Sequence, residues 1–150
     1  MKSKENTLKI LLDTSFILPT LGIDTGKNVI KTLEKIDNIN AEIYFSMFSV
    51  LEGIWIAIRF IKKSKFNEQS FRNGLKAIMR YGRYIKILEN EDIIYGALDL
   101  YRMKHKDIID NILYMDSVYF DLRLLTLDNE LRNFIRSNKL KDTLIFPDEL

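Results

Sequence analysis

The stretch "TLKILLD", residues 7–13, is the part of the sequence that best indicates the fold. It is a short apolar run, rich in branched side chains, and it ends at a carboxylate, Asp13. Such a run is typical of a strand buried on both faces of a sheet, as the strands of parallel sheets are. We therefore expect an α/β fold with Asp13 at the carboxyl end of a strand, the edge at which parallel sheets bind ligands.

Strands and helices alternate along the rest of the sequence. Further short apolar runs predict strands at residues 41–46, 83–88, 122–127 and 142–146. Apolar residues at helical spacing predict helices at residues 25–36, 49–63, 67–82, 90–106, 107–121 and 129–140. The alternation predicts a three-layer α/β/α sandwich around a mostly parallel sheet of four to five strands, with right-handed crossovers. With no repeat or linker, residues 1–150 are expected to form a single domain.

The composition argues against several classes of site and location. The chain has no cysteine, so it forms neither disulfides nor thiolate metal sites, which fits a reducing cytoplasm. The one histidine, His105, lies among lysines, where a solvated group is expected rather than part of a catalytic triad. Residues 43–61 are strongly apolar, but Glu52 at their centre argues against a membrane span. The N-terminal apolar stretch is too short for a signal peptide, so we expect a cytoplasmic protein without membrane contact.

Acidic side chains follow the predicted strands at the same edge of the sheet. Asp13 follows the first strand, Glu52 lies one helical turn beyond the second, and Asp128 follows the fourth. Asp107 and Asp110 lie three positions apart, on one face and near the start of a predicted helix. Carboxylates gathered in one small volume repel one another and raise each other's pKa unless a cation lies between them.

These acids also have purely structural interpretations. Asp13 and Asp128 could be helix N-caps, and Ser49 with Glu52 fits a capping box at the start of a helix. If the acids share a cation instead, only oxygen ligands are on offer, and these favour Mg²⁺ or Mn²⁺ over Zn²⁺. Such an ion can activate water against a phosphodiester, so the pattern indicates a nuclease.

A basic segment precedes the acidic half of the chain. Between Arg59 and Lys86 there are nine Lys or Arg residues and one acid, whereas residues 89–150 carry thirteen acids and eight Lys or Arg residues. The segment is either a pair of helices with solvated cationic faces or a surface that contacts RNA phosphates. The residues that we expect to guide RNA are Arg59, Lys62, Lys63, Lys65, Arg80 and Arg83.

Aromatic and methionine side chains leave a second choice open, between packing and base stacking. The residues that recur at helical spacing, and that we interpret as core or dimer-interface packing, are Trp55, Phe60, Tyr114, Met115 and Tyr119. The better candidates for base stacking, because they lie within the basic segment, are Phe66, Phe71, Tyr81 and Tyr84.

Three motifs together resemble the PIN-domain ribonucleases, the fold of the VapC toxins of toxin–antitoxin modules and of archaeal stand-alone relatives. The motifs are "ILLDTSF" (10–16), "FSMFSVLEG" (45–53) and "DIIDNILYMDSVYFDLRLLTLDNEL" (107–131). In the last motif, Asp110 and Asp128 keep the spacing between the family's helix aspartate and the Thr-x-Asp after its fourth strand. The resemblance extends from the first predicted strand to the last.

This resemblance implies Mg²⁺- or Mn²⁺-dependent hydrolysis of RNA phosphodiesters. It also implies a homodimer and, for the toxins, a small antitoxin protein that inhibits the enzyme. The implied metal ligands are Asp13, Glu52, Asp110 and Asp128, with Asp107 as a further ligand through water. The small hydroxyl residues implied to orient these ligands are Thr14, Ser15, Ser46 and Thr126.

The sequence departs from the family in the helix after Asp110, where relatives usually continue Asp-Ala-Leu-Ile-Ala-Ala. Asn111, Tyr114 and Met115 replace small residues, and Asn111 could reach either the site or the solvent. Asp116 is an added acid that we expect to face away from Asp110. Two other functions are considered: a PIN-like RNA-binding or assembly module without turnover, and a structural oligomer whose acids are only helix caps.

Overall fold

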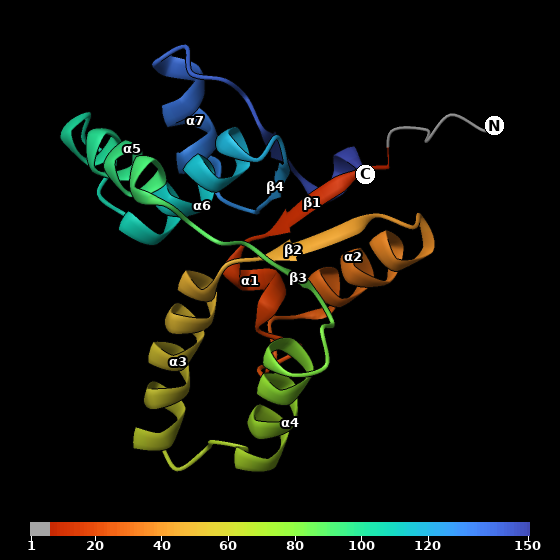
Figure 1. Cartoon of the computed structure of the whole chain (residues 1–150). Helices are drawn as coiled ribbons and strands as arrows, with labels where there is room; N and C mark the ends of the chain where they lie inside the picture. The colour runs from red at the N-terminus through yellow and green to blue at the C-terminus, as the bar shows by residue number, and fades with distance from the viewer. Residues whose placement is uncertain (1–6) are drawn as a thin grey trace.

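The computed structural model describes residues 7–150, which form a five-stranded sheet flanked by helices (Figure 1). All neighbouring strands in this part of the chain are parallel, and their order is β3-β2-β1-β4-β5. The strands are β1 (Lys9–Leu12), β2 (Glu42–Phe45), β3 (Ile85–Lys86), β4 (Arg123–Leu125) and β5 (Leu144–Ile145). The helices are α1 (Thr14–Ile17), α2 (Lys27–Asn38), α3 (Met47–Lys62), α4 (Glu68–Met79), α5 (Glu91–Arg102), α6 (Ile108–Tyr119), α7 (Asn129–Ser137) and the 3₁₀ helix η1 (Pro147–Glu149).

Alternate residues of the strands face two apolar cores, one on each side of the sheet. Ile10 and Leu12 of β1 pack in one core with Phe16, whereas Leu11 packs in the other with Leu113 of α6. Since successive side chains of a strand point to opposite faces, the uninterrupted apolar run of β1 serves both cores. The predicted three-layer α/β/α sandwich is therefore confirmed.

The helices divide between the two faces of the sheet. Buried residues of α1, α2 and α4 contribute to one core, and buried residues of α5, α6 and α7 contribute to the other. In Figure 1, α5, α6 and α7 lie together on one side, and α3 and α4 project away from the sheet. Their placement leaves the carboxyl ends of β1 and β4 facing the start of α3 and α6, where the predicted acids are.

The strand order changes direction at β1. From β1 the chain adds β2 and β3 on one side, and it then returns to place β4 and β5 on the other. In open α/β sheets, ligands bind at the carboxyl ends of the strands at such a switch point. The ends of β1 and β4 are therefore the place where the fold provides a site.

Every predicted strand and helix is present, but some boundaries differ. The strands are shorter than predicted, and α4 ends at Met79 rather than at Gly82. Helix α3 begins at Met47 with Ser46 as its N-cap, so the predicted start at Ser49 and its capping box with Glu52 are wrong. Ser49 lies within the first turn of this helix, so it does not act as its cap.

The prediction that residues 43–61 do not cross a membrane concerns strand β2 and most of α3. Within residues 7–150, no helix has the length and apolar character needed to span a membrane. The prediction that the N-terminus is not a signal peptide concerns a segment that begins with residues 1–6. These residues lie outside the described residues. The single domain over residues 1–150 stays a prediction.

Candidate metal centre

Asp13 occupies the junction of β1 and α1, at the switch point of the sheet. Its backbone N–H donates to Leu125 O of β4 at 3.1 Å, which fixes it between the two central strands. Its Oδ1 accepts the backbone N–H of Thr14 at 2.6 Å, and its Oδ2 accepts the hydroxyl of Thr126 at 2.8 Å. The residue is 9% exposed, so this carboxyl group is held rigidly in a largely dry position.

Thr126 connects Asp13 to Asp128. The Thr126 hydroxyl donates to Asp13, and its oxygen accepts the backbone N–H of Asp128 at 3.0 Å. Asp128 caps α7, with its Oδ1 accepting the N–H of Leu131 at 3.1 Å. One fully buried hydroxyl group thus sets the positions of two of the four predicted ligands.

Asp110 approaches the same place from the start of α6. Asp107 caps this helix and accepts the N–H of Asp110 at 3.1 Å. Burial raises the pKa of Asp110 to about 9, and the charge of Asp13, hydrogen bonding to Asp128 and the charges of Asp107 and Asp128 act in the same direction. Asp110 is therefore within interaction distance of Asp13 and Asp128.

Glu52 completes the group from α3. Burial raises its pKa, the Thr14 hydroxyl lowers it, Asp107 raises it and Arg59 lowers it. The Thr14 hydroxyl is buried and has no hydrogen-bond partner of normal geometry within residues 7–150. Glu52 is partly buried, and its charge also acts on Asp13.

The pKa of Asp13 reflects the whole group. Burial raises it to about 6, the hydrogen bonds from Thr126 and Thr14 lower it, and the charges of Glu52 and Asp128 raise it again. Asp13 thus interacts with Asp110, Asp128 and Glu52, which come from three different helices. Like charges held together in this way favour either protonation or a shared cation.

The fit of a divalent cation can be judged from the donors. All donors are carboxyl or hydroxyl oxygens, the ligand type that suits Mg²⁺ and Mn²⁺. The buried hydroxyl of Thr14, next to Asp13 in the sequence, has no partner within residues 7–150. In the same residues, however, no three Asp, Glu or His side chains are drawn together tightly enough to hold an ion. The residues thus fit a divalent ion in the chemistry of their donors.

The structural interpretation of the acids is right in part. Asp13, Asp107 and Asp128 are helix N-caps, as their side-chain hydrogen bonds show. Asp110 and Glu52 cap no helix, so capping does not explain why both interact with Asp13. Because a capping carboxylate keeps free lone pairs, the two roles are compatible.

Residues 10–136, from β1 into α7, match the PIN domain family, and this range contains all four predicted ligands. The chain belongs to the PIN domain family. Among curated proteins, none matches the sequence significantly.

Three solved structures are similar to this PIN domain over nearly their whole length. A toxin–antitoxin complex from Klebsiella pneumoniae has a TM-score of 0.58 at 15% identity, covering 94% of this chain and 99% of that chain. VapBC2 from Rickettsia felis, bound to a DNA fragment from its promoter, has a TM-score of 0.58 at 12% identity, covering 93% and 97%. FitAcB from Neisseria gonorrhoeae has a TM-score of 0.54 at 18% identity, covering 94% and 99%. At such identities the likeness shows the fold.

The remaining hydroxyl residues of the PIN domain lie at different distances from the acids. Ser15 is partly buried in α1, two positions after Asp13. Ser46 caps α3 and donates to Glu89, so its hydroxyl is directed to a different acid. Thr126 is thus the hydroxyl residue whose side chain forms hydrogen bonds with two predicted ligands, Asp13 and Asp128.

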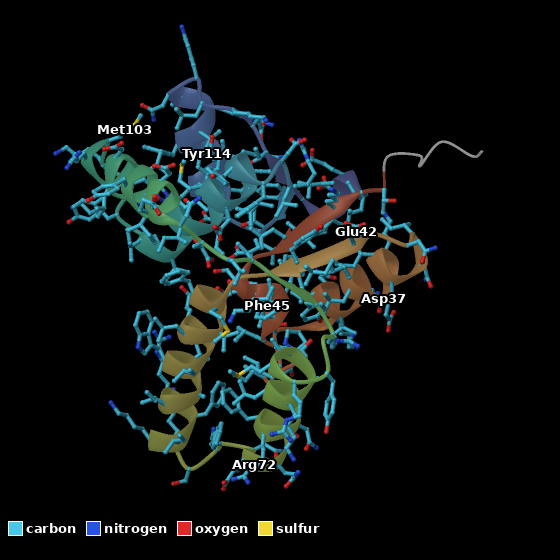
Figure 2. All side chains as sticks on the ribbon, viewed as in Figure 1. Asp37, Glu42, Phe45, Arg72, Met103 and Tyr114 are labelled. Carbon is cyan, nitrogen blue, oxygen red and sulfur yellow. The ribbon has the colours of Figure 1, made fainter. Side chains whose placement is uncertain are left out.

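The predicted RNA-guiding residues occupy α3, α4 and the segments that follow them. Arg59 is the one whose charge reaches a ligand within the described residues, since it lowers the pKa of Glu52. Arg83 instead donates to the Tyr84 hydroxyl at 3.3 Å and is attracted by Asp37 of α2. Figure 2 shows Arg72, another cation of the segment, near the end of α4 that is remote from the sheet. The basic residues therefore extend from the acids along the projecting helices. All six predicted RNA-guiding residues are exposed: Arg59, Lys62, Lys63, Lys65, Arg80 and Arg83.

The aromatic residues correct part of the sequence interpretation. Trp55 is 46% exposed and Tyr119 is 51% exposed, so core packing is wrong for both, and dimer packing stays a prediction. Tyr84 is buried and bonded to Thr20, so it is not free to stack on a base. Tyr81 is 71% exposed and stays a stacking candidate. Phe66 packs edge-on against Phe71.

Two polar contacts around α6 were not predicted. Asn111 is fully buried and reaches neither the site nor the solvent; its side chain bonds to His105 Nδ1 at 2.6 Å and to His105 O at 2.7 Å. His105 is partly buried and packs on Phe134, so the expectation of a solvated histidine is wrong. Asp116 is fully buried, and that it faces away from Asp110 stays a prediction. The acid that faces Asp116, Glu89, lies outside α6, so the spacing of residues within α6 could not predict this contact.

Proposed function

We propose that this PIN domain is a metal-dependent endoribonuclease that hydrolyses RNA phosphodiesters with Mg²⁺ or Mn²⁺. The observation that carries the proposal is the mutual influence of Asp13, Glu52, Asp110 and Asp128 at the switch point of the sheet. Membership of the family and the oxygen-only donor set support it. A purely structural set of helix caps has no need to bring these acids within reach of one another.

The four acids would hold the ion, and Asp107, at the rim, would contribute through water. A divalent ion in such a site supplies charge that polarises the phosphodiester and lowers the pKa of water. The protein's own contribution is positional: Thr126 orients Asp13 and Asp128, and burial keeps Asp13 in one place. The raised pKa of Asp110 gives the site a group that holds a proton until a cation displaces it.

The exposed cations of α3 and α4 would bind the RNA backbone. Phosphate contacts of this kind provide affinity that is independent of base sequence, so they would hold the strand without selecting one defined sequence. Arg59 is the cation that links this surface to the acids, through Glu52.

Protein partners are also part of the proposal. The similar structures from Klebsiella, Rickettsia and Neisseria include a toxin–antitoxin complex and the VapBC2 and FitAcB proteins. We propose that this chain acts as the toxin of such a pair and is inhibited by a small antitoxin. We also propose a homodimer in the cytoplasm, for which the exposed Trp55 and Tyr119 offer apolar surface.

A cleavage assay with Asp13→Asn tests the proposal. The wild-type protein should cut single-stranded RNA oligonucleotides with Mn²⁺ and not with EDTA. Asp13→Asn keeps the shape of the side chain and one of its two acceptor oxygens, enough to accept the backbone N–H of Thr14, so it should fold. Its kcat/KM should nevertheless fall by more than about a hundredfold, since even outer residues of metal sites contribute about 10–100-fold.

The controls separate the rival functions. Asp99→Asn, an exposed residue paired with Arg102, removes one charge outside the site and should cut RNA normally. Salt-sensitive RNA binding that ignores EDTA, with the RNA left intact, would instead identify a binding module without turnover. Undiminished cleavage by Asp13→Asn would refute the assignment of the site.

A further inference from the structure

A second pair of acids, Asp116 and Glu89, lies outside the metal centre. Asp116 is in α6, and its side chain is fully buried. Within residues 7–150, neither of its carboxyl oxygens has a hydrogen-bond partner of normal geometry. The charged group that faces it is Glu89, in the segment between β3 and α5. A buried carboxyl group without a partner is costly, so this pair needs a physical explanation.

Glu89 is held by a donor from another element. The Ser46 hydroxyl donates to Glu89 Oε1, and the Ser46 oxygen accepts the backbone N–H of Phe48 at 3.2 Å. Because a hydroxyl has one proton and Ser46 gives it to Glu89, Glu89 acts as the acceptor, a role that an ionised carboxylate can fill with either oxygen. The positive N-terminal end of α3 favours the same charge state. Glu89 is therefore the charged member of the pair.

Asp116 is then the neutral member. Burial, followed by the charge of Glu89 and hydrogen bonding to it, raises the pKa of Asp116 to about 9. In the described residues, no charged group of α3, α5 or β4, which pack against α6, adds to this shift. A neutral carboxylic acid has a proton to donate, and Glu89 is the acceptor that faces it.

The pair joins the two helices that present two of the predicted ligands. Ser46 caps α3, which carries Glu52 six residues later. Asp116 belongs to α6, which carries Asp110 six residues earlier. Helices α3 and α6 also pack against each other. Ser46 at the start of α3 is thus bonded to Glu89, and Glu89 faces Asp116 in the last turn of α6.

We propose that Asp116 is a positioning residue: as a neutral carboxylic acid, it donates a hydrogen bond to Glu89 after a small side-chain rotation. This bond holds α6 against the start of α3, so that Asp110 and Glu52 keep their places in the metal centre. The positioning role rests on the proposed function, whereas the neutral state of Asp116 does not. A cation between Asp116 and Glu89 is disfavoured, because the positive end of α3 lies beside the pair.

The first test measures the protonation of Asp116 with Asp116→Asn, which keeps a donor but cannot ionise. In the wild type, the unfolded chain loses the Asp116 proton at low pH while the folded chain keeps it, so this residue lowers stability progressively from about pH 4 towards pH 9. The Tm of Asp116→Asn relative to wild type should therefore rise between about pH 5 and pH 8. The infrared carbonyl band of one protonated acid should also disappear.

The control for this test is Asp99→Asn, which should shift the Tm equally at both pH values because Asp99 is exposed. In a Glu89→Gln background, which lacks the facing charge, the gain from Asp116→Asn should be smaller. A Tm difference that stays constant with pH, together with an unchanged infrared band, would show that Asp116 is ionised and would overturn the proposal.

The second test measures positioning, by calorimetric titration with Mn²⁺. Asp116→Leu fills the same space without a donor and should bind Mn²⁺ roughly tenfold more weakly, as outer residues of metal sites do. Asp116→Asn should rescue the affinity to within about threefold of wild type. Unchanged Mn²⁺ affinity in Asp116→Leu would overturn the positioning role. If the wild type itself fails to bind Mn²⁺, the proposed function and the positioning role both fail, while the pH test still decides the state of Asp116.

Discussion

Thr126 shows how much of the site depends on single atoms. Its hydroxyl donates to Asp13 and its oxygen accepts the N–H of Asp128, so one side chain connects residues that are far apart in the sequence. The resemblance to the PIN-domain ribonucleases implied an orienting role for Thr126, which comes two residues before Asp128 after the same strand. The distances show that the connection is direct.

Thr126→Val removes both bonds while keeping the shape of the side chain. The variant should lose about 10–100-fold in kcat/KM, because Asp13 and Asp128 lose their orientation. It should also lose about 1–3 kcal/mol in the free energy of unfolding, because buried polar groups are left unpaired. Cleavage assays and urea unfolding measure the two effects.

Thr126→Ser is the matched control, since it keeps the hydroxyl, and it should retain activity within a few-fold of the wild type. If the valine variant were as active as the serine variant, the hydroxyl would have no part in orienting the acids.

Some residues of the site could not be predicted, for identifiable reasons. Asp13 and Asp128 were predictable because each follows an apolar strand, and strand ends meet at one edge of a sheet. The pairing of Asp116 with Glu89 was not, because it depends on how the segment before α5 packs on α6. Nothing in the local sequence around Asp116 encodes that contact.

At the scale of elements, apolar patterns predicted all five strands and the six longer helices of the described residues, but neither the short α1 and η1 nor every helix end. Ser46 and Ser49 are both followed at short range by residues compatible with a helix start, and the local pattern favoured Ser49. The structure decides otherwise, because α3 already begins at Met47, where the Ser46 side chain accepts the backbone N–H of Phe48, and Ser49 lies inside the first turn. Helix ends depend on tertiary contacts, which explains this error.

Helix α4 makes an unusually close approach to the segment after α1. A Cβ atom on Gly74 would lie 2.1 Å from Thr20 O, a backbone atom that cannot move aside easily. Gly74→Ala should therefore lower the free energy of unfolding by about 1–3 kcal/mol, although alanine is the better helix former.

Urea unfolding measures this effect, and Lys76→Ala, an exposed change in the same helix, should stay within about 0.5 kcal/mol of wild type. A Gly74→Ala variant as stable as the wild type would mean that α4 can shift without cost.

At the scale of the whole molecule, the buried acids make stability depend on pH. Asp13, Asp110 and Asp116 have pKa values raised to about 6, 9 and 9, so between about pH 4 and pH 9 the folded chain holds more protons than the unfolded chain. The free energy of unfolding therefore falls as pH rises through this range. Without added metal, the Tm should fall by more than about 5 °C between about pH 5 and pH 8.

Millimolar Mn²⁺ should reverse this fall, because the ion binds the ionised carboxyl groups of the folded state. The increase in Tm on adding Mn²⁺ should thus be larger near pH 8 than near pH 5. Scanning calorimetry measures both values, and Asp13→Asn should abolish most of the increase. An increase of equal size at both pH values would argue that Mn²⁺ binds elsewhere.

The account as a whole depends on the acids at the ends of β1 and β4 sharing one divalent ion. The most direct measurement is the anomalous difference density of crystals soaked in millimolar Mn²⁺. We expect a strong peak in contact with Asp13 and with Asp110 or Asp128. A map that shows Mn²⁺ only at other sites, or no peak among these carboxyl groups, would contradict the account.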